Sequence, residues 1–292
     1  MSSITTDQGI VHYEVYGRGR PVILLHGWLG SWGLWQETMA YLGRYYRTYA
    51  LDFWGFGDSG KKRETYAVQD FVDLVDQFMD HLGIVQAPLV GHSMGGTVSL
   101  SVAIQYPQRV SKVVVIGSPI IGSSLAIPLK LAGYRFVAFM LFNAMWAFRA
   151  GMKVAYPFMC TDPRFAQMMD RDLSQTTVES FLRSIASLRR TDLRPMLSEL
   201  KMPVMGMYGD RDNIVHPRQW EPLLQGVPHA RVVRWKRAQH FVMLDTSQDF
   251  MEKLKDFLDE TDAPKPDAPK TDVPKTDVPK TDAPKPDVVQ PS

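Results

Sequence analysis

The sequence predicts an α/β protein with a mainly parallel, doubly wound sheet. Short apolar runs at residues 22–25 and 112–116 are typical of strands that a parallel sheet buries on both faces. Such runs alternate with helical patterns as far as residue 119, which is the order of elements in a doubly wound fold. The composition, with 45% apolar and 22% charged residues, is that of an ordinary folded domain.

Local patterns predict the elements of the first half. Residues 10–16 alternate between apolar and polar side chains, as a half-exposed strand does. Residues 68–82 place apolar side chains at helical spacing with aspartates on the opposite face, which predicts an amphipathic helix. Further strands are expected at residues 22–25, 47–51, 87–90 and 112–116, and further helices at residues 34–45 and 96–104.

The alternation stops after residue 119. Residues 120–194 contain no strand pattern, and residues 131–148 are strongly apolar and aromatic. Because Arg135 and Asn143 interrupt this stretch and its length is near the lower limit for a bilayer span, we do not expect a transmembrane helix. We predict instead a helical cap that covers the site and is inserted after the sixth strand. Basic residues among the aromatic ones leave open a peripheral membrane contact through this cap.

The sheet pattern resumes in the second half. Strands are expected at residues 203–208 and 231–235, and a final helix at residues 247–258. The predicted core therefore comprises residues 1–119 and 195–260, and the predicted cap comprises residues 120–194. From residue 261 a pentad of the type TDAPK repeats, and its regular prolines with balanced Asp and Lys predict a disordered tail over residues 261–292. The pattern does not identify a partner for this tail.

Charge and cysteine content restrict the partners and the compartment. The net charge of +2 is too small to indicate a nucleic acid as partner. The single cysteine, Cys160, excludes an intramolecular disulfide, and we expect it to be an inert buried thiol. The first residues lack the basic start and apolar core of a signal peptide, so a cytoplasmic protein is expected.

The most informative motif lies at residues 91–95, which read GHSMG and match G-x-S-x-G. It stands between a predicted strand and a helix of small apolar residues, so Ser93 lies at a sharp strand-to-helix turn. Glycines two residues before and after the serine let the strand and the helix approach without a Cβ clash. We therefore expect Ser93 to have a strained backbone and a nucleophilic hydroxyl that is lifted clear of the sheet, with the N-terminal amides of the helix directed at the group it attacks.

Two loops before the serine carry residues of interest. The sequence HGWLG follows a buried strand, and we expect the backbone N–H of Trp28 to be one arm of an oxyanion hole, with that of Met94 as the other. The ring of His26 is expected to order this loop rather than to move protons. Asp52 and Asp58 lie in a glycine-rich loop and are expected to be structural, because the acid of this arrangement follows the serine in the chain.

Serine hydrolysis needs a base for the Oγ proton and a carboxylate that orients the base. Ser93, Asp212 and His240 occur in that chain order, each just after a predicted strand, so all three are expected at one edge of the sheet. The turn that holds Asp212 also holds Asp210, and the pattern alone does not separate the two aspartates.

From about residue 8 to 258 the chain resembles the α/β-hydrolase family, in its capped branch with a serine nucleophile. The resemblance implies a sheet of α/β-hydrolase type and implies that Asp212, rather than Asp210, is the acid. Dehalogenases and epoxide hydrolases of this family have aspartate where Ser93 stands, so those activities are not expected. The matching motifs are HG-x at 26–28, D-x-x-G-x-G-x-S at 52–59, G-x-S-x-G at 91–95, G-D-x-D at 209–212 and the late His240.

These residues predict a carboxylesterase- or lipase-like serine hydrolase that cleaves esters of small apolar substrates through an acyl-enzyme intermediate. Ser93 would attack, His240 would act as base and then as acid, Asp212 would orient it, and the amides of Trp28 and Met94 would hold the oxyanion. No metal or organic cofactor is needed. The alternatives are a carbon–carbon bond hydrolase or an acyltransferase of the same family, or a non-catalytic ligand receptor on the same fold.

Overall fold

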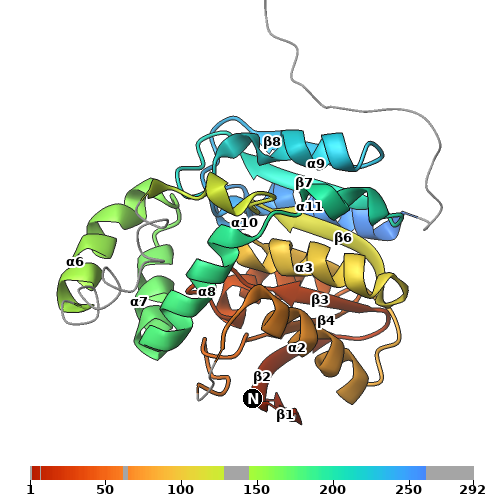
Figure 1. Cartoon of the computed structure of the whole chain (residues 1–292), viewed down its shortest axis with the longest axis horizontal. Coiled ribbons are helices and arrows are strands. Elements are labelled where there is room, and N and C mark those ends of the chain that lie inside the picture. Colours follow the sequence, from red (N-terminus) through yellow and green to blue (C-terminus); the bar gives the residue numbers. More distant parts are fainter. Residues whose placement is uncertain (1, 7, 62–64, 128–144, 261–292) are drawn as a thin grey trace, which may run out of the picture.

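The computed structural model of the chain describes residues 2–6, 8–61, 65–127 and 145–260. Eight strands of these residues form one sheet in the order β1-β2-β4-β3-β5-β6-β7-β8 (Figure 1). The pairs β1–β2 and β2–β4 are antiparallel and all others are parallel, which confirms the predicted fold class. The strands are β1 (Ser2–Thr6), β2 (Gly9–Gly17), β3 (Pro21–Leu25), β4 (Arg47–Leu51), β5 (Ala87–His92), β6 (Val110–Ile116), β7 (Val204–Gly209) and β8 (Arg231–Trp235).

The central strands are apolar because both of their faces are covered. In β3 the residues from Val22 to Leu25 are fully buried, and so are the last four residues of β6. Branched aliphatic side chains suit such doubly covered strands. The parallel register places the ends of β5, β6, β7 and β8 at one edge of the sheet, which is where open α/β sheets build their sites.

Helices cover the two faces of the sheet. Helices α2 (Val68–His81) and α3 (Met94–Gln105) pack against each other and lie in front of the sheet in Figure 1, whereas α1 (Gln36–Leu42) contacts α11 (Ser247–Asp259). Helix α2 buries one apolar face, but α3 is buried along residues 94–103 on every side. Its small residues allow this close approach to β5 and β6. The short helices α9 (Trp220–Gly226) and α10 (Val242–Asp245) complete the second half.

The segment between β6 and β7, residues 120–194, is called the insert below. It contains α6 (Met145–Ala155), α7 (Phe165–Gln175) and α8 (Val178–Arg190), which lie to one side of the sheet (Figure 1). It follows the sixth strand, as predicted. Most of the apolar stretch 131–148 lies outside the described residues, and the tail 261–292 lies outside them entirely. No helix among the described residues is both long and apolar enough to cross a bilayer.

Three details differ from the expected elements. Strand β1 carries the polar sequence SSITT, which has little strand pattern of its own and is a strand because it pairs with β2 at the sheet edge. The expected helix at residues 34–45 is divided into a 3-10 turn over Trp32–Trp35 and the shorter α1. Helix α10 was not expected, because four residues carry no helical period.

A buried lysine fixes the last helix to the sheet. Lys112 of β6 is 2% exposed, and its ammonium group donates hydrogen bonds to the carbonyls of Phe257 and Leu258 at 3.0 and 2.9 Å. It also contacts the carbonyl of Glu260. The last carbonyls of a helix have no partner within the helix, so Lys112 satisfies groups that would otherwise be unpaired.

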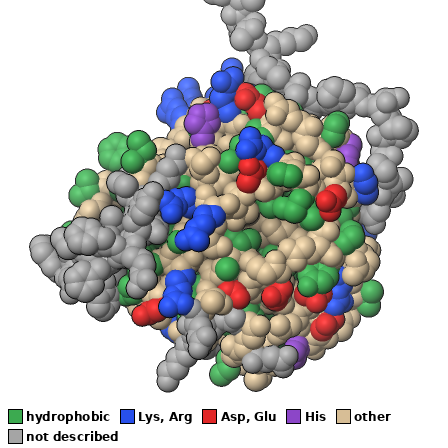
Figure 2. All heavy atoms as spheres, viewed as in Figure 1, with side chains coloured by type: hydrophobic (Ala, Val, Ile, Leu, Met, Phe, Trp, Pro, Cys, Tyr) green, Lys and Arg blue, Asp and Glu red, His purple; other side chains and the backbone are tan. Residues whose placement is uncertain are grey.

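The visible surface carries charges of both signs. On the face shown in Figure 2, basic and acidic side chains are interspersed with hydrophobic ones. This distribution fits the small net charge of the chain.

Candidate active site

Ser93 lies at the turn between β5 and α3 in a strained backbone conformation. Its φ and ψ are 51° and −117°, a region that a residue with a Cβ rarely adopts. The turn is held by a hydrogen bond from the N–H of Ser93 to the carbonyl of Ile116 on β6, at 2.8 Å. A Cβ at Gly91 would overlap the backbone of Gly95, and one at Gly95 would overlap the carbonyl of Leu25. Both glycines are therefore required by close backbone contacts, as the motif predicted.

Asp212 and His240 form a buried pair. Asp212 follows β7 and His240 follows β8, and Nδ1 of His240 lies 2.7 Å from Oδ2 of Asp212. The other carboxylate oxygen of Asp212 accepts the backbone N–H groups of Ile214 and Val215 at 2.8 and 2.9 Å. Both oxygens are thus occupied, so the carboxylate has a fixed orientation. A carboxylate at Nδ1 keeps the proton on that nitrogen and leaves Nε2 of the neutral ring as an acceptor.

The second aspartate of the same turn has a different partner. Asp210 accepts hydrogen bonds from Nε and Nη2 of Arg234 at 2.9 and 2.8 Å. Arg234 lies on β8, directly opposite Tyr208 of β7. The carboxylate of Asp210 is therefore engaged away from His240, and Asp212 is the one that contacts the histidine.

Several contacts place the histidine beside the serine turn. The ring of His92, which precedes Ser93, lies 4.7 Å from the ring of His240, and its Nε2 donates to the carbonyl of His240 at 3.2 Å. Gly117, just after β6, lies against the same pair. A Cβ at this glycine would be 3.2 Å from Nδ1 of His240 and 3.4 Å from Oδ2 of Asp212. Ser93 and His240 form no hydrogen bond within the described part of the chain, and such bonds are often loose before substrate binds.

His92 is a neutral spacer in this arrangement. Burial, and to a smaller extent the neighbouring His240, lowers its pKa well below the usual value. Because Nε2 donates to a carbonyl, the proton of the neutral ring is on that nitrogen. Sequence reasoning missed this role of His92, because the motif leaves the residue between glycine and serine unspecified.

The loop after β3 is ordered by its histidine, as expected. Nδ1 of His26 lies 2.7 Å from the carbonyl of Gly27, and Nε2 accepts the N–H of Phe53 at 2.9 Å. Burial lowers the pKa of His26, which fits a neutral ring with one donor and one acceptor. The loop turns tightly, with a hydrogen bond from Gly30 to Gly27 at 3.1 Å and a left-handed Leu29 at φ 62°.

The two predicted oxyanion donors flank the serine turn. A Cβ at Gly27, next to Trp28, would lie 3.1 Å from Cβ of Ser93, so this backbone passes close to the serine. Met94 is the first residue of α3, where N–H groups have no partner within the helix. The positions of Trp28 and Met94 are compatible with an oxyanion hole, and that role remains a prediction.

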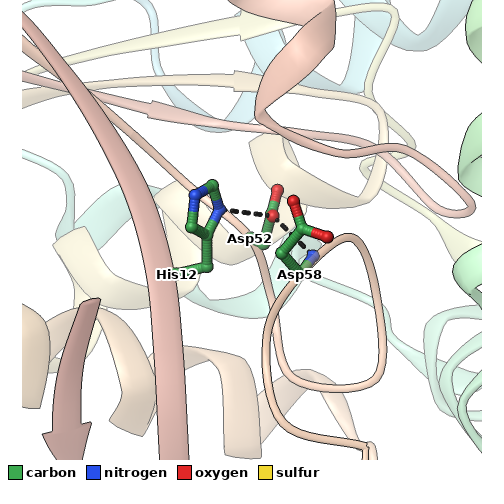
Figure 3. A group of neighbouring side chains, drawn as sticks. All are labelled: His12, Asp52 and Asp58. Atoms are coloured by element: carbon green, nitrogen blue, oxygen red, sulfur yellow. Dashed lines mark hydrogen bonds and ion pairs between the residues drawn. The ribbon is translucent and has the colours of Figure 1, made fainter. Parts of the chain in front are cut away.

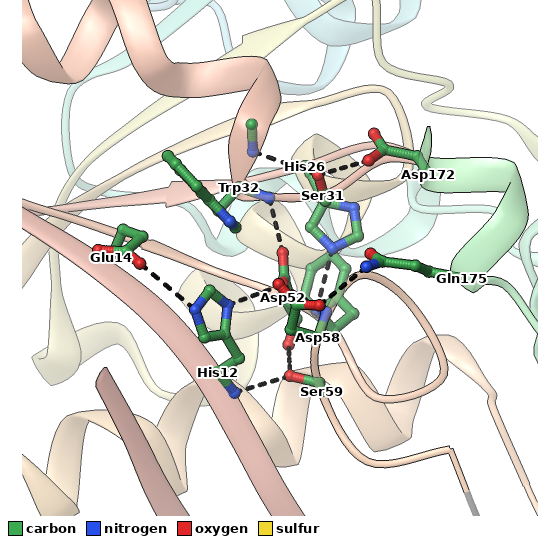
Figure 4. Close-up of polar contacts among 12 residues, drawn as sticks. His12, Glu14, His26, Ser31, Trp32, Asp52, Asp58, Ser59, Asp172 and Gln175 are labelled. Carbon is green, nitrogen blue, oxygen red and sulfur yellow. Dashed lines mark hydrogen bonds and ion pairs between the residues drawn. The ribbon is translucent and has the colours of Figure 1, made fainter. Parts of the chain in front are cut away.

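Asp52 has the structural role that was expected. Its carboxylate accepts the N–H groups of Trp32 and Asp58 at 2.6 and 2.9 Å and contacts Nδ1 of His12 at 2.9 Å (Figures 3 and 4). The sequence did not reveal His12 as its partner. The hydrogen bond that His12 donates to Asp52 raises the pKa of the histidine, against the effect of burial.

His12, Asp52 and Asp58 are also the group that could be considered for a metal, because their ligand atoms lie within 4.8 Å of one another. Each carboxylate oxygen of Asp52 already accepts a backbone N–H group, and Asp58 accepts the amide of Gln175 of the insert at 2.9 Å. These hydrogen bonds account for the cluster without an ion.

Aromatic side chains of the insert approach the histidine. The ring of Phe165 on α7 lies 4.5 Å from that of Phe241, which in turn lies edge-on to His240 at 5.2 Å. The ring of Phe181 on α8 lies 4.6 Å from the ring of Trp28. The sequence did not single out these aromatic residues, since apolar residues at helical spacing predict packing and no more.

The fold and the serine turn together define a hydrolase-type α/β protein, and comparison with known proteins gives the family. A model of the alpha/beta hydrolase fold matches residues 20–247, and the chain belongs to this family. A pimeloyl-acyl-carrier-protein methyl ester esterase of Aliivibrio fischeri is 25% identical over 272 residues, covering 86% of this chain and 98% of its own.

The chain is also similar to a second hydrolase and to a solved structure. A 2-hydroxy-6-oxo-6-phenylhexa-2,4-dienoate hydrolase of Comamonas testosteroni is 26% identical over 264 residues, covering 85% of this chain and 91% of its own. The crystal structure of a hydrolase from Pseudomonas aeruginosa PA01 matches with a TM-score of 0.78 and 22% identity, covering 89% of this chain and 98% of the other. The last likeness bears on the fold alone.

Proposed function

We propose that this chain is a serine hydrolase that cleaves carboxylic esters of small apolar substrates through an acyl-enzyme intermediate. The observation that carries the proposal is the buried Asp212–His240 pair beside the strained turn of Ser93. A strained turn of this kind persists only where the surrounding structure holds it, and such turns are concentrated at functional sites. The esterase of Aliivibrio fischeri supports the ester as substrate class.

The reaction would begin with attack of Ser93 Oγ on the ester carbonyl while Nε2 of His240 takes the proton. The negative charge that forms on the carbonyl oxygen would be held by the N–H groups of Trp28 and Met94, and each such donor contributes about 2.7–4 kcal/mol to transition-state stabilisation. His240 would then protonate the departing alcohol, and water activated by the same ring would release the acid. Asp212 would stabilise the imidazolium in both steps.

The aromatic surroundings support an apolar substrate. Phe241 lies edge-on to His240 and packs against Phe165 of the insert, and Phe181 of the insert packs against Trp28 of the loop after β3. Rings of this kind favour an apolar acyl or alcohol group by burial. A preference for short charged esters over medium-chain ones would contradict this part of the proposal.

A carbon–carbon bond hydrolase is the second candidate, because the Comamonas testosteroni relative is named for such a substrate and covers the same part of the chain. The two activities share the serine machinery and differ in the bond that breaks. Side-by-side assays with aryl esters and with a vinylogous diketone acid separate them, since faster turnover of the diketone would favour the second candidate. Membrane contact through the cap and a cytoplasmic location remain predictions.

The test is labelling by a fluorophosphonate together with hydrolysis of p-nitrophenyl esters of graded chain length. Ser101→Ala is the matched control for Ser93→Ala, because Ser101 also lies in this region and both serines are 6% exposed. We expect wild type and Ser101→Ala to label and turn over, and Ser93→Ala to do neither. A wild-type protein that neither labels nor hydrolyses any ester would favour the ligand receptor instead.

A further inference from the structure

The loop after β3 is attached to the insert at two points. Nε1 of Trp28 donates to the carbonyl of Phe181 on α8 at 3.0 Å. Oγ of Ser31 donates to Oδ1 of Asp172 on α7 at 2.8 Å (Figure 4). The loop that carries the predicted oxyanion donor is therefore in direct contact with both helices.

Asp172 is an unusual residue at such a contact. It is 1% exposed, and its second oxygen, Oδ2, is buried without a hydrogen-bond partner among the described residues. The charged groups that face it are Asp52 and Asp58 of the core and Arg171 of its own helix, which itself lies 3.7 Å from Asp58. A buried carboxyl with one unpaired oxygen lowers the stability of the fold. Its presence here indicates that the contact with Ser31 contributes to function and not to stability alone.

Ser31 connects Asp172 to the backbone of the loop after β3. Its Oγ accepts the N–H of Gly33 at 3.2 Å while it donates its one proton to Asp172, so the carboxyl determines which way the hydroxyl points. The preceding turn contains the left-handed Leu29 and is closed by the Gly30–Gly27 hydrogen bond. A leucine in that conformation persists only if its surroundings hold it.

We propose that Asp172 is a positioning residue that, through Ser31, holds the strained Gly27–Ser31 turn and with it the backbone N–H of Trp28. This inference rests on the proposed function, in which that N–H group holds the oxyanion. Asp172 touches no reacting atom. Its effect is to keep an insert helix and the oxyanion loop in one arrangement.

The protonation of Asp172 gives the contact a dependence on pH. Burial, reinforced by Asp52 and Asp58, raises the pKa of Asp172 to about 7, although the hydrogen bond from Ser31 and the charge of Arg171 lower it. Below pH 7 the carboxyl is neutral and still accepts from Ser31. Above pH 7 a negative charge forms beside Asp52 and Asp58, which weakens the packing of α7 on the core. Asparagine has the shape of the neutral acid and cannot ionise.

The experiment compares wild type, Asp172→Asn, Asp172→Ala and Ser31→Ala, with Asp170→Asn as control. Asp170 lies on the same helix but contacts Tyr156 and Lys153 of the insert. We expect Asp172→Ala and Ser31→Ala to lower kcat for a p-nitrophenyl ester about tenfold with little change in KM, and the double variant to be no worse than either single one. We expect wild-type kcat to fall above pH 7, and we expect Asp172→Asn to retain kcat at pH 6 and to lack that fall.

Hydrogen exchange of the backbone amides is the second readout, and it does not depend on catalysis. Residues 27–31 should exchange faster in Asp172→Ala and in Ser31→Ala than in wild type, and at the wild-type rate in Asp170→Asn. Unchanged exchange together with unchanged kcat would overturn the inference. If wild type shows neither ester turnover nor labelling, the proposed function fails, and the exchange data still decide whether Asp172 holds the turn.

Discussion

Replacing each aspartate of the turn after β7 by asparagine tests the assignment of the acid. Asp212 and Asp210 are two residues apart, and asparagine is close in shape to aspartate. Oδ2 of Asp212 accepts a hydrogen bond from Nδ1 of His240, whereas Asp210 pairs with Arg234. The same substitution should therefore lower activity strongly at Asp212 and leave it unchanged at Asp210.

The size of each effect follows from these contacts. In Asp212→Asn, Oδ1 can still accept the N–H groups of Ile214 and Val215, so the amide must turn its NH₂ group toward His240. That donor favours the tautomer with the proton on Nε2, which cannot act as a base. We expect kcat to fall about 10⁴-fold, or about 5 kcal/mol in activation free energy. Asp210→Asn removes a partly exposed ion pair, so it should cost about 0.2–1 kcal/mol of stability and leave kcat unchanged.

The assay is steady-state hydrolysis of a p-nitrophenyl ester by both variants and wild type at equal concentration. Urea unfolding of each protein shows whether a loss of activity reflects loss of the fold. Equal losses of kcat in Asp210→Asn and Asp212→Asn would refute the assignment, as would an Asp212→Asn variant within tenfold of wild type.

Three further substitutions test the packing next to the serine turn, the attachment of α11 to the sheet and the charge of Asp172. Gly96→Ala should destabilise the chain by about 1–3 kcal/mol, because its Cβ would overlap Oγ of Ser118, and adding Ser118→Gly should recover part of this loss in urea unfolding. Lys112→Met leaves carbonyls of α11 without their donor and should lower the free energy of unfolding by about 1–3 kcal/mol, whereas Lys236→Met, at an exposed position, should leave it unchanged. Equal urea midpoints for the two variants would contradict the capping role of Lys112. Burial raises the pKa of Asp172 from 3.8 to about 7 on folding, so the wild-type free energy of unfolding should fall as the pH rises from about 4 to about 7. Relative to Asp172→Asn, the loss should reach about 4 kcal/mol. Parallel plots of stability against pH for the two proteins would exclude the raised pKa.

The sequence contained enough to place Ser93, the turn of Asp210 and Asp212, and His240 each just after a predicted strand, although the roles assigned to them stay predictions. Carboxyl ends of neighbouring parallel strands share one edge of the sheet, so chain order alone brings Ser93, Asp212 and His240 into one region. The choice between Asp210 and Asp212 required a family resemblance. Its physical reason, the pairing of Asp210 with Arg234, depends on the register of β7 and β8, which no local pattern specifies.

Contacts between distant segments could not be predicted. Asp52 meets His12 across 40 residues of chain, and Ser31 meets Asp172 across 141. Periodicity predicts whether a residue faces the core or the solvent, and the partner of a buried polar group depends on how whole elements pack. Strand β1 escaped prediction for a related reason: Ile4, Thr5 and Thr6 suit a strand, but five mostly polar residues carry too short a pattern to show that they pair with β2.

The contacts between the insert and the loop after β3 affect how the substrate specificity of this chain could change. Trp28 takes part twice: its backbone is the predicted oxyanion donor, and its indole packs on Phe181 and donates to that residue's carbonyl. Ser31, three residues further on, contacts Asp172. On the proposed function, a substitution that shifts α7 or α8 should therefore also move the loop that carries the predicted oxyanion donor. Variants selected for new substrates should then show compensating changes in the loop after β3.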